Sequence, residues 1–224
     1  MNSNKQGTKQ MIQVTKRAAT YRNACKRMHK QSIKLGSGAF ANVFLKQADY
    51  PSAVKLARFN EECPGKDGYY NYLEAIISSD NPHLPKVMGA VLCKPRECNP
   101  YVKVELEPLV SIDELQLDEL VHVLSTSFGM NADCLEYVTF DYLIDELVTK
   151  FARGCRDCYH DTYCWSAELR DVAVIINNLM HAGFTLDIHA GNIMFRRTPF
   201  GVQLVITDPL SFCRSSNNGR TFTV

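Results

Sequence analysis

Short runs of β-branched and apolar residues, separated by Gly, Asp and Pro, fill the first half of the chain. They predict three antiparallel strands followed by two further strands, at residues 33–35, 41–45, 52–57, 86–92 and 101–106. Between these two groups, the apolar positions 69, 72, 73, 76 and 77 have helical spacing and predict one amphipathic helix. Pro108 cannot continue a strand ladder, so we expect a linker near that position.

The second half is mainly helical in pattern. Helices are predicted over 111–127, 140–153 and 166–182, with Ser111 and Ser166 as N-caps. Two apolar strands joined by a turn follow, and the second one ends before Asp208. The pattern therefore predicts an α+β protein with a polar arm (1–30, helical from about 10 to 28), a sheet lobe (31–108) and a helix-rich lobe (109–224).

The composition fits a folded protein with a sizeable core, since 46% of the 224 residues are apolar. No run of 18 apolar residues occurs and the first residues do not form a signal peptide, so we expect a soluble, intracellular protein without a membrane partner. Nine scattered cysteines favour reduced thiols. Cys155, Cys158, His160 and Cys164 have a spacing that matches no familiar metal module, which leaves structural zinc as the alternative to free thiols.

The net charge of +1 conceals a strong segregation. Residues 1–34 contain nine Lys or Arg and no acid, whereas residues 104–149 contain eleven Asp or Glu and no Lys or Arg. We interpret this as a solvated basic arm beside an acidic helical surface, with an electrostatic partner as the alternative. Direct nucleic-acid binding is not expected, because the arm offers no stacking residue beyond Tyr21.

Two features of the sheet lobe suggest phosphate binding. Gly36 and Gly38 stand between two predicted strands, where a tight turn can bring backbone N–H groups onto phosphate oxygens. Lys55 follows in Ala53-Val54-Lys55 on the next strand. A partly buried lysine needs an anion, so we expect an ion pair with Glu74 on the helix, the alternative being that Glu74 is a solvated helix residue.

A stronger pattern lies near the end of the sequence, in Asp187-Ile188-His189-Ala190-Gly191-Asn192 and in Asp208. Asp187 is placed to accept the proton of an attacking hydroxyl, and Asn192 and Asp208 offer oxygen ligands to Mg²⁺ on a nucleotide. His189 either donates a hydrogen bond to the transferring phosphoryl group or orients Asp187. Together with the lysine and the glycines, this order indicates phosphoryl transfer.

Over residues 32–213 this order resembles the protein-kinase-like fold: two lobes, an antiparallel sheet with one helix, and a reduced α-rich lobe. Residues 186–195 and 206–212 are similar to those of the early serine/threonine protein kinases of T-odd type bacteriophages. The resemblance implies ATP and Mg²⁺ as cofactors and host bacterial proteins as substrates, including transcription or RNA-processing machinery, in the host cytoplasm. It implies catalytic roles for Asp187, His189 and Lys55, and metal binding by Asn192 and Asp208. It assigns the nucleotide to Gly36, Ser37, Gly38, Ala39, Phe40, Val43, Ala53, Lys55, Glu74 and Glu107.

Several positions depart from the kinase pattern. Ala41 replaces the third glycine, Thr185 and Leu186 replace the His and Arg before the base, and Pro209 follows the metal aspartate. Without that Arg we expect constitutive activity. Only 16 residues follow Asp208, which predicts a reduced surface for docking peptides and leaves the arm, the acidic helices or a second subunit of a homodimer to hold the substrate. The rival functions are a small-molecule phosphotransferase like aminoglycoside or choline kinases, and a pseudokinase that binds a host factor.

Overall fold

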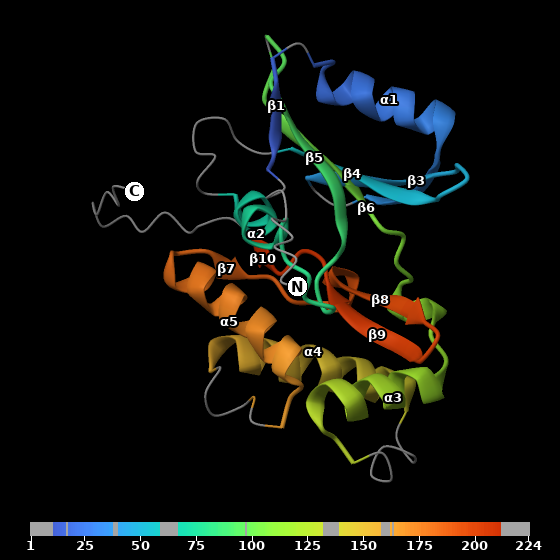
Figure 1. Ribbon diagram of the computed structural model, residues 1–224, viewed down its shortest axis with the longest axis vertical. Helices are drawn as coiled ribbons and strands as arrows, with labels where there is room; N and C mark the ends of the chain where they lie inside the picture. Colours follow the sequence, from blue (N-terminus) through green and yellow to red (C-terminus); the bar gives the residue numbers. More distant parts are fainter. Residues whose placement is uncertain are drawn as a thin grey trace, which may run out of the picture.

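The computed structural model describes residues 11–16, 18–37, 40–58, 67–96, 98–131, 139–157, 162 and 164–211. The prediction of an α+β protein is confirmed (Figure 1): a twisted sheet with two helices forms one lobe, and most of the remaining helices form the other. The segment after β6 and the turns around β7 to β10 connect the two lobes.

The upper lobe contains a six-stranded sheet in the order β1-β5-β6-β4-β3-β2. The five strands predicted from the pattern are present and antiparallel to one another; they are β2 (Ile33–Ser37), β3 (Ala41–Lys46), β4 (Ser52–Arg58), β5 (Val87–Cys93) and β6 (Tyr101–Leu106). The sixth strand, β1 (Gln13–Thr15), pairs in parallel with β5, so the sheet is mixed and not purely antiparallel.

Helices cover both faces of this sheet: one is the helix predicted within residues 31–108, and the other comes from the segment predicted as an arm. The outer face, with Phe44, Val54 and Leu56 fully buried, packs against α1 (Tyr21–Gln31). The inner face, rich in small residues such as Ala53 and Ala57, packs against α2 (Gly68–Ile76), which confirms the predicted amphipathic helix. Small side chains on the inner face let the helix and the second lobe approach the strands closely.

The predicted helix over residues 10–28 was wrong in extent. Residues Gln13–Thr15 form a strand, and α1 begins only after Thr20, whose hydroxyl accepts a hydrogen bond from the Asn23 N–H as an N-cap. Half-buried side chains of α1 contact the sheet, and the ring of Tyr21 meets that of Tyr101 edge to face at 5.7 Å. The described part of the basic segment, with β1 and α1, is therefore docked on the sheet lobe.

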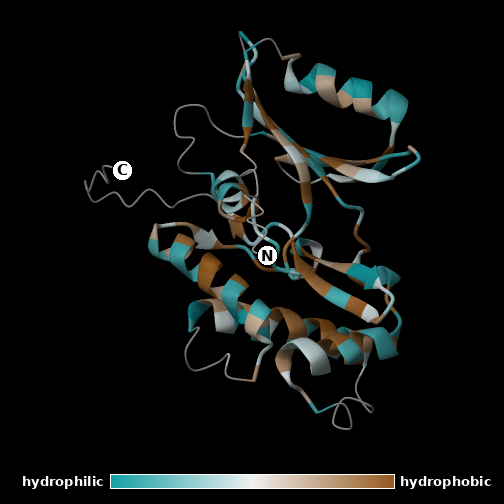
Figure 2. Ribbon diagram, in the orientation of Figure 1, coloured by the Kyte–Doolittle hydropathy of each residue, from teal (hydrophilic) through white to brown (hydrophobic). Residues whose placement is uncertain are grey.

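The lower lobe packs three long helices beneath a hairpin. Its elements are η2 (Ile112–Glu114), α3 (Leu117–Phe128), α4 (Phe140–Arg156), α5 (Ala167–His181), β7 (Thr185–Leu186), η4 (Ala190–Asn192), β8 (Ile193–Thr198), β9 (Gly201–Ile206) and β10 (Leu210–Ser211). Figure 2 shows their apolar faces turned toward one another. The helix predicted from residue 111 is divided, because the segment at Leu115–Gln116 is extended and each part begins with its own capping box.

Helix α2 belongs to both hydrophobic cores. Leu73 lies in the core of the sheet lobe, while Tyr72 and Ile76 lie in the core of the helical lobe. The fully buried hydroxyl of Tyr72 donates a hydrogen bond to the Ile206 carbonyl of β9 at 2.8 Å. This helix therefore fixes the sheet relative to the end of the β8–β9 hairpin.

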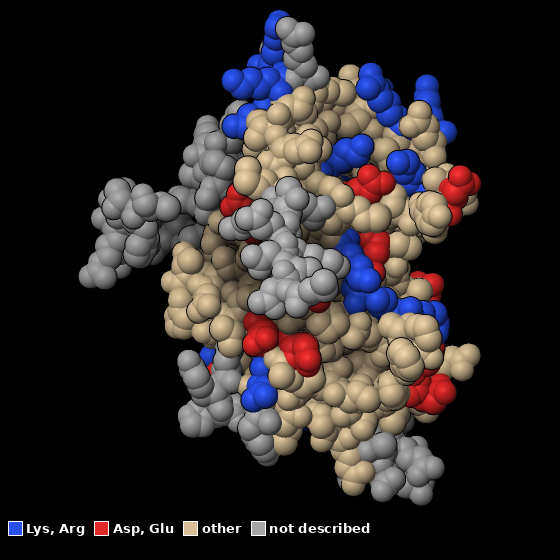
Figure 3. Space-filling model, viewed as in Figure 1, with Lys and Arg blue, Asp and Glu red and all other residues tan. Residues whose placement is uncertain are grey.

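The two charged segments lie far apart in the fold. The basic segment contributes β1 and α1 at the top of the upper lobe, where Figure 3 shows blue side chains, and the acidic segment contributes α3 and α4 at the bottom. In the part of the chain that the structure describes, no ion pair joins one segment to the other. None of the described helices is both long and apolar enough to cross a membrane.

Candidate active site

Two short β pairings bring Asp187, Asn192 and Asp208 to one place. In the β8–β9 hairpin, Ile193 pairs with Ile206, so Asn192 and Asp208 stand at the same end of the hairpin. Strands β7 and β10 pair Leu186 with Leu210, which sets Asp187 beside the segment that carries Asp208. The Asp187 N–H donates to the Pro209 carbonyl at 2.8 Å and closes this arrangement.

Asn192 is held by the backbone on both sides. Its side-chain amide donates to the Asp187 carbonyl at 2.7 Å, and its own carbonyl accepts bonds from the N–H and the hydroxyl of Thr207 at 3.0 Å. With the NH₂ group engaged, the amide oxygen is the part of the side chain left to bind a ligand. Asn192 thus connects Asp187, the predicted base, to Thr207, which precedes the predicted metal ligand Asp208.

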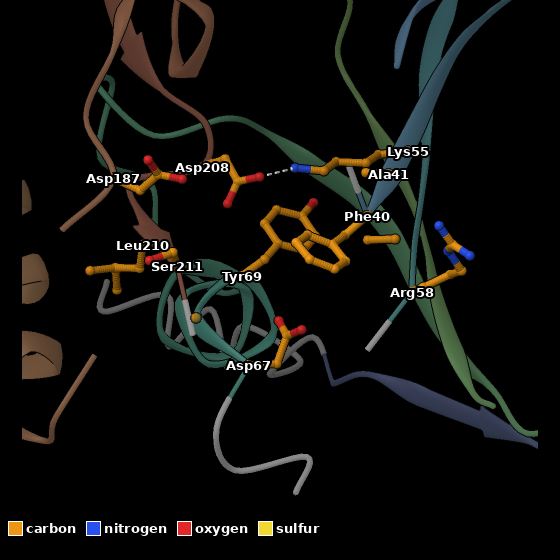
Figure 4. A pocket seen from close by; sticks show the side chains of 12 residues that line it. Phe40, Ala41, Lys55, Arg58, Asp67, Tyr69, Asp187, Asp208, Leu210 and Ser211 are labelled. Carbon is orange, nitrogen blue, oxygen red and sulfur yellow. Dashed lines mark hydrogen bonds and ion pairs between the residues drawn. The ribbon is translucent and has the colours of Figure 1, made fainter. Parts of the chain in front are cut away.

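Lys55 and Asp208 meet across the two lobes. The ammonium of Lys55, on β4, lies 2.6 Å from a carboxylate oxygen of Asp208 and 3.5 Å from the centre of the Tyr69 ring (Figure 4). Lys55 is only 9% exposed, so its charge is largely removed from water. Asp187 lies beside Asp208 in the same view, with its side chain exposed.

The predicted ion pair between Lys55 and Glu74 was wrong. Glu74 is exposed on α2, and its carboxylate accepts a hydrogen bond from the hydroxyl of Tyr70. Burial, and to a lesser extent this hydrogen bond, raises the pKa of the Tyr70 phenol to about 12. The buried positions of α2 are Gly68, Tyr72, Leu73 and Ile76, so Glu74 points away from the sheet. Lys55 takes its counterion from the other lobe instead.

A cleft of about 120 Å³ surrounds the pair. It is lined by the end of the β2–β3 hairpin, β4, the start of α2, β10 and the two aspartates. Asp67, the N-cap of α2, is buried there, and its carboxylate accepts a hydrogen bond from the Tyr70 N–H at 2.8 Å. Burial raises the pKa of the Asp67 carboxyl, and the negative charge of Asp208 adds to that rise.

Of the predicted nucleotide residues, Phe40 and Lys55 line the cleft, and Val43 pairs with Lys55 in the sheet. Ala53 is buried on the same strand face as Lys55, while Ser37 is exposed at the end of β2. Gly36 lies at a shift in the β2–β3 register, and a Cβ placed there would meet no heavy atom within 4 Å. Gly38 and Ala39 lie outside the described residues.

Glu107 has a different environment. Its carboxylate pairs with Arg196 of β8 and accepts the Lys86 N–H at 2.8 Å, and it does not line the cleft. Burial alone would raise the pKa of Glu107, yet the bonds from Arg196 and Lys86 hold it below its usual value. Its side chain is thus committed to joining the linker to the hairpin.

His189 shapes the turn that follows Asp187. Its ring Nδ1 accepts the Gly191 N–H at 3.1 Å, and the residue caps the short helix η4. The exposed ring does not line the cleft and bonds to the turn rather than to Asp187. The hydrogen bond of His189 lies within the turn. It supports neither of the two predicted roles, which were a bond to the phosphoryl group and the orientation of Asp187.

The sequence reasoning missed Asp67, Gly68 and Tyr69. A Cβ at Gly68 would lie 2.4 Å from the Ser211 carbonyl oxygen, so glycine allows α2 to start against the backbone of β10. The sequence did contain one signal: an Asp directly before a Gly and a run of apolar helix positions is an N-cap pattern. Their place in the cleft, in contrast, depends on how the two lobes meet.

No group of three or more His, Cys, Asp or Glu side chains suited to a metal occurs among the described residues. Of the four residues considered for the alternative zinc site, Cys155 is buried in α4 and Cys164 is exposed, and neither forms a disulfide. Cys158 and His160 lie outside the described residues.

The chain matches no protein-family model, and no curated protein is similar to it. The candidate site therefore stands on its geometry: a buried lysine and two aspartates line one cleft between two lobes, and an asparagine bonds to the backbone of one of these aspartates.

Proposed function

We propose that this protein is an ATP-dependent protein kinase that transfers a γ-phosphoryl group to a Ser or Thr hydroxyl. The observation that carries the proposal is the 2.6 Å contact between Lys55 and Asp208 with Asp187 in the same cleft. Lys55 lies on the strand that follows the glycine hairpin, and the two aspartates follow the helical part of the lower lobe. This order and this meeting point support a protein-kinase-like fold.

Each residue of the site has a role in this chemistry. Lys55 binds phosphate oxygens of the nucleotide, and Asp187 accepts the proton of the attacking hydroxyl. Asn192 offers its free amide oxygen, and Asp208 its carboxylate, to Mg²⁺. When bound, the ion neutralises charge on the phosphates.

The donor set suits Mg²⁺ better than a metal held by protein alone. Mg²⁺ commonly keeps several waters and binds through one or two carboxylates plus substrate phosphates. One carboxylate with one amide oxygen, and no cluster of three ligating side chains among the described residues, fits that mode. Asp208 would hold the ion through its carboxylate, and Lys55 would supply its positive charge to the phosphates.

One feature of strand β2 and one of the cleft support a nucleotide entering under the β2–β3 hairpin. The space above Gly36 contains no protein atom within 4 Å of a built Cβ, so a phosphate can approach the backbone there. The volume of about 120 Å³ lies below the range of roughly 300–1,000 Å³ for sites that enclose small molecules. This size suits the phosphate part of a nucleotide better than the whole molecule.

The substrate class rests on the resemblance to phage serine/threonine kinases. Host bacterial proteins in the cytoplasm are accordingly the proposed substrates. Radiolabelled γ-phosphate ATP incubated with a bacterial lysate and wild-type protein should label protein bands, and Asp208→Ala should not. Label found only in small metabolites would indicate a small-molecule phosphotransferase. No Asp208-dependent label at all would contradict the enzyme and favour a binding protein.

A further inference from the structure

The surroundings of Lys55 leave one question open, namely what orients the lysine once a nucleotide is bound. Its described contacts are the carboxylate of Asp208 and the ring of Tyr69, and the buried carboxylate of Asp67 interacts with it electrostatically without a direct contact. If Asp208 binds the metal ion of the nucleotide, its contact with Lys55 weakens. Glu74, the acidic residue of the helix, is exposed and bonded to Tyr70. Among the described residues, the ring of Tyr69 is then the direct contact that remains.

The position of Tyr69 is fixed by its neighbours along the chain. Asp67 caps the helix through the Tyr70 N–H, and Gly68 lies against the backbone of Leu210 and Ser211 with no room for a side chain. Tyr69 follows directly and its ring lies under the ammonium of Lys55 (Figure 4). Burial, together with Asp208 and Asp67, raises the pKa of Tyr69 well above its usual value, so the phenol stays neutral.

We propose that Tyr69 is the positioning residue for Lys55, taking the place that the sequence assigned to Glu74. The inference rests on the proposed function. A ring face attracts the ammonium through its quadrupole and contributes no counter-charge. The lysine is held in the cleft while its full positive charge remains available to phosphate oxygens. A glutamate in the same place would compete with the nucleotide for that charge.

Three variants separate this role from a structural one. Tyr69→Phe keeps the ring and removes the hydroxyl, Tyr69→Leu removes the ring and keeps an apolar side chain, and Glu74→Gln is the matched control on the same helix. Thermal unfolding and circular dichroism establish that each variant is folded before comparison.

The first readout does not require a nucleotide. Acetylation of Lys55 by a lysine-reactive ester is followed by mass spectrometry, with exposed Lys30 as internal reference. Tyr69→Leu should raise the relative rate at Lys55 by about fivefold or more, because the ring no longer holds the ammonium. Tyr69→Phe and Glu74→Gln should match wild type. Equal rates in Tyr69→Leu and wild type would overturn the inference, whatever the protein does with ATP.

The second readout is the dissociation constant for Mg·ATP, measured by calorimetry. Tyr69→Leu should weaken binding by about two- to thirtyfold, the range of cation–π energies, with Tyr69→Phe near wild type. In a Lys55→Met background the same Tyr69→Leu change should have no further effect, because the ring acts through the lysine. An equal loss in both backgrounds would overturn the inference. Absence of ATP binding by wild type would overturn the proposed function, while the acetylation result still decides the role of Tyr69.

Discussion

Two ion pairs, Glu107–Arg196 and Lys55–Asp208, join the sheet lobe or the linker after it to the β8–β9 hairpin and the residues that follow it. They differ in how many of their hydrogen-bonding groups have partners. Arg196 donates to the carboxylate of Glu107, to the side chain of Gln203 at 2.7 Å, and to the carbonyls of Pro82 and Leu84 at 2.6 and 3.0 Å. Lys55 has one carboxylate and one ring.

The difference separates a structural contact from a chemical one. The side chain of Arg196 is 12% exposed, and all the N–H donors of its guanidinium are used. It therefore has no donor left for a ligand. The Lys55–Asp208 pair has donors and acceptors that are not used by each other, and it opens onto a cleft. The side chain of Asp208 is 29% exposed. We infer that Arg196 fixes the junction of the lobes so that Lys55 and Asp208 can exchange partners within it.

The largest expected effect comes from removing the open pair. Asp208→Ala should lower kcat/KM for phosphoryl transfer by about a thousandfold, because the metal ion loses its only carboxylate. The melting temperature should also fall, because the largely buried Lys55 loses its carboxylate partner, so activity is compared at a temperature where both proteins are folded. Asp171→Ala, an exposed aspartate on α5, is the matched control and should be fully active. Activity of Asp208→Ala within tenfold of wild type would break the comparison.

The closed pair should show the opposite behaviour. Arg196→Leu should lower the free energy of unfolding by about 3 kcal/mol, since it leaves the largely enclosed carboxylate of Glu107 without its cationic partner. The neighbouring Arg197→Leu removes an exposed pair with Glu119 and should cost about 1 kcal/mol or less. Chemical denaturation measures both. If Arg196→Leu were as stable as Arg197→Leu, the junction would not depend on this pair.

Two glycines extend the comparison between structural and ligand-binding positions, with smaller expected effects: Gly68 contacts the backbone of β10, and Gly36 faces open space. Gly68→Ala forces a Cβ against backbone oxygens and should destabilise the protein by about 1–3 kcal/mol. Gly36→Ala meets no protein atom, so its stability should equal that of wild type, while the KM for ATP rises about tenfold if phosphates occupy that space. Thermal unfolding and steady-state kinetics decide between them. Gly36→Ala with an unchanged KM would place the nucleotide elsewhere.

The smallest effects are pH-dependent and opposite in sign. The pKa of Glu107 is lowered in the folded protein, so its contribution to stability is present above its usual value near 4.5 and is lost as pH falls. The pKa of Asp67 is raised, so its contribution is present below its usual value near 3.8 and is lost as pH rises.

Conservative amide variants measure this difference. The stability deficit of Glu107→Gln should shrink on acidification, whereas Asp67→Asn, which keeps an N-cap, should gain on wild type as pH rises above 4. Urea denaturation between about pH 3 and pH 7 provides the measurement. Parallel curves for the two variants would mean that the two carboxylates do not differ as described.

The sequence predicted what periodicity and local chemistry encode. The five antiparallel strands, α2 and the elements around Asp187 and Asp208 follow from apolar spacing and capping residues near them in the chain. Strand β1 could not be foreseen, because its three residues pair with Val91–Cys93, about eighty positions away. The same limit applies to Lys55. The sequence offers Glu74 as a counterion, but Glu74 lies on the exposed side of α2, and the contact between the lobes brings Asp208 to the lysine instead.

The central claim is that the open Lys55–Asp208 pair binds a nucleotide through Mg²⁺. Calorimetric titration of ATP into wild type and Asp208→Ala, each with Mg²⁺ and with EDTA, tests it most directly. Wild type should bind ATP at least about tenfold more tightly with Mg²⁺, and Asp208→Ala should lose that difference while remaining folded. An equal response to Mg²⁺ in both proteins, or no binding of ATP by wild type, would contradict the claim.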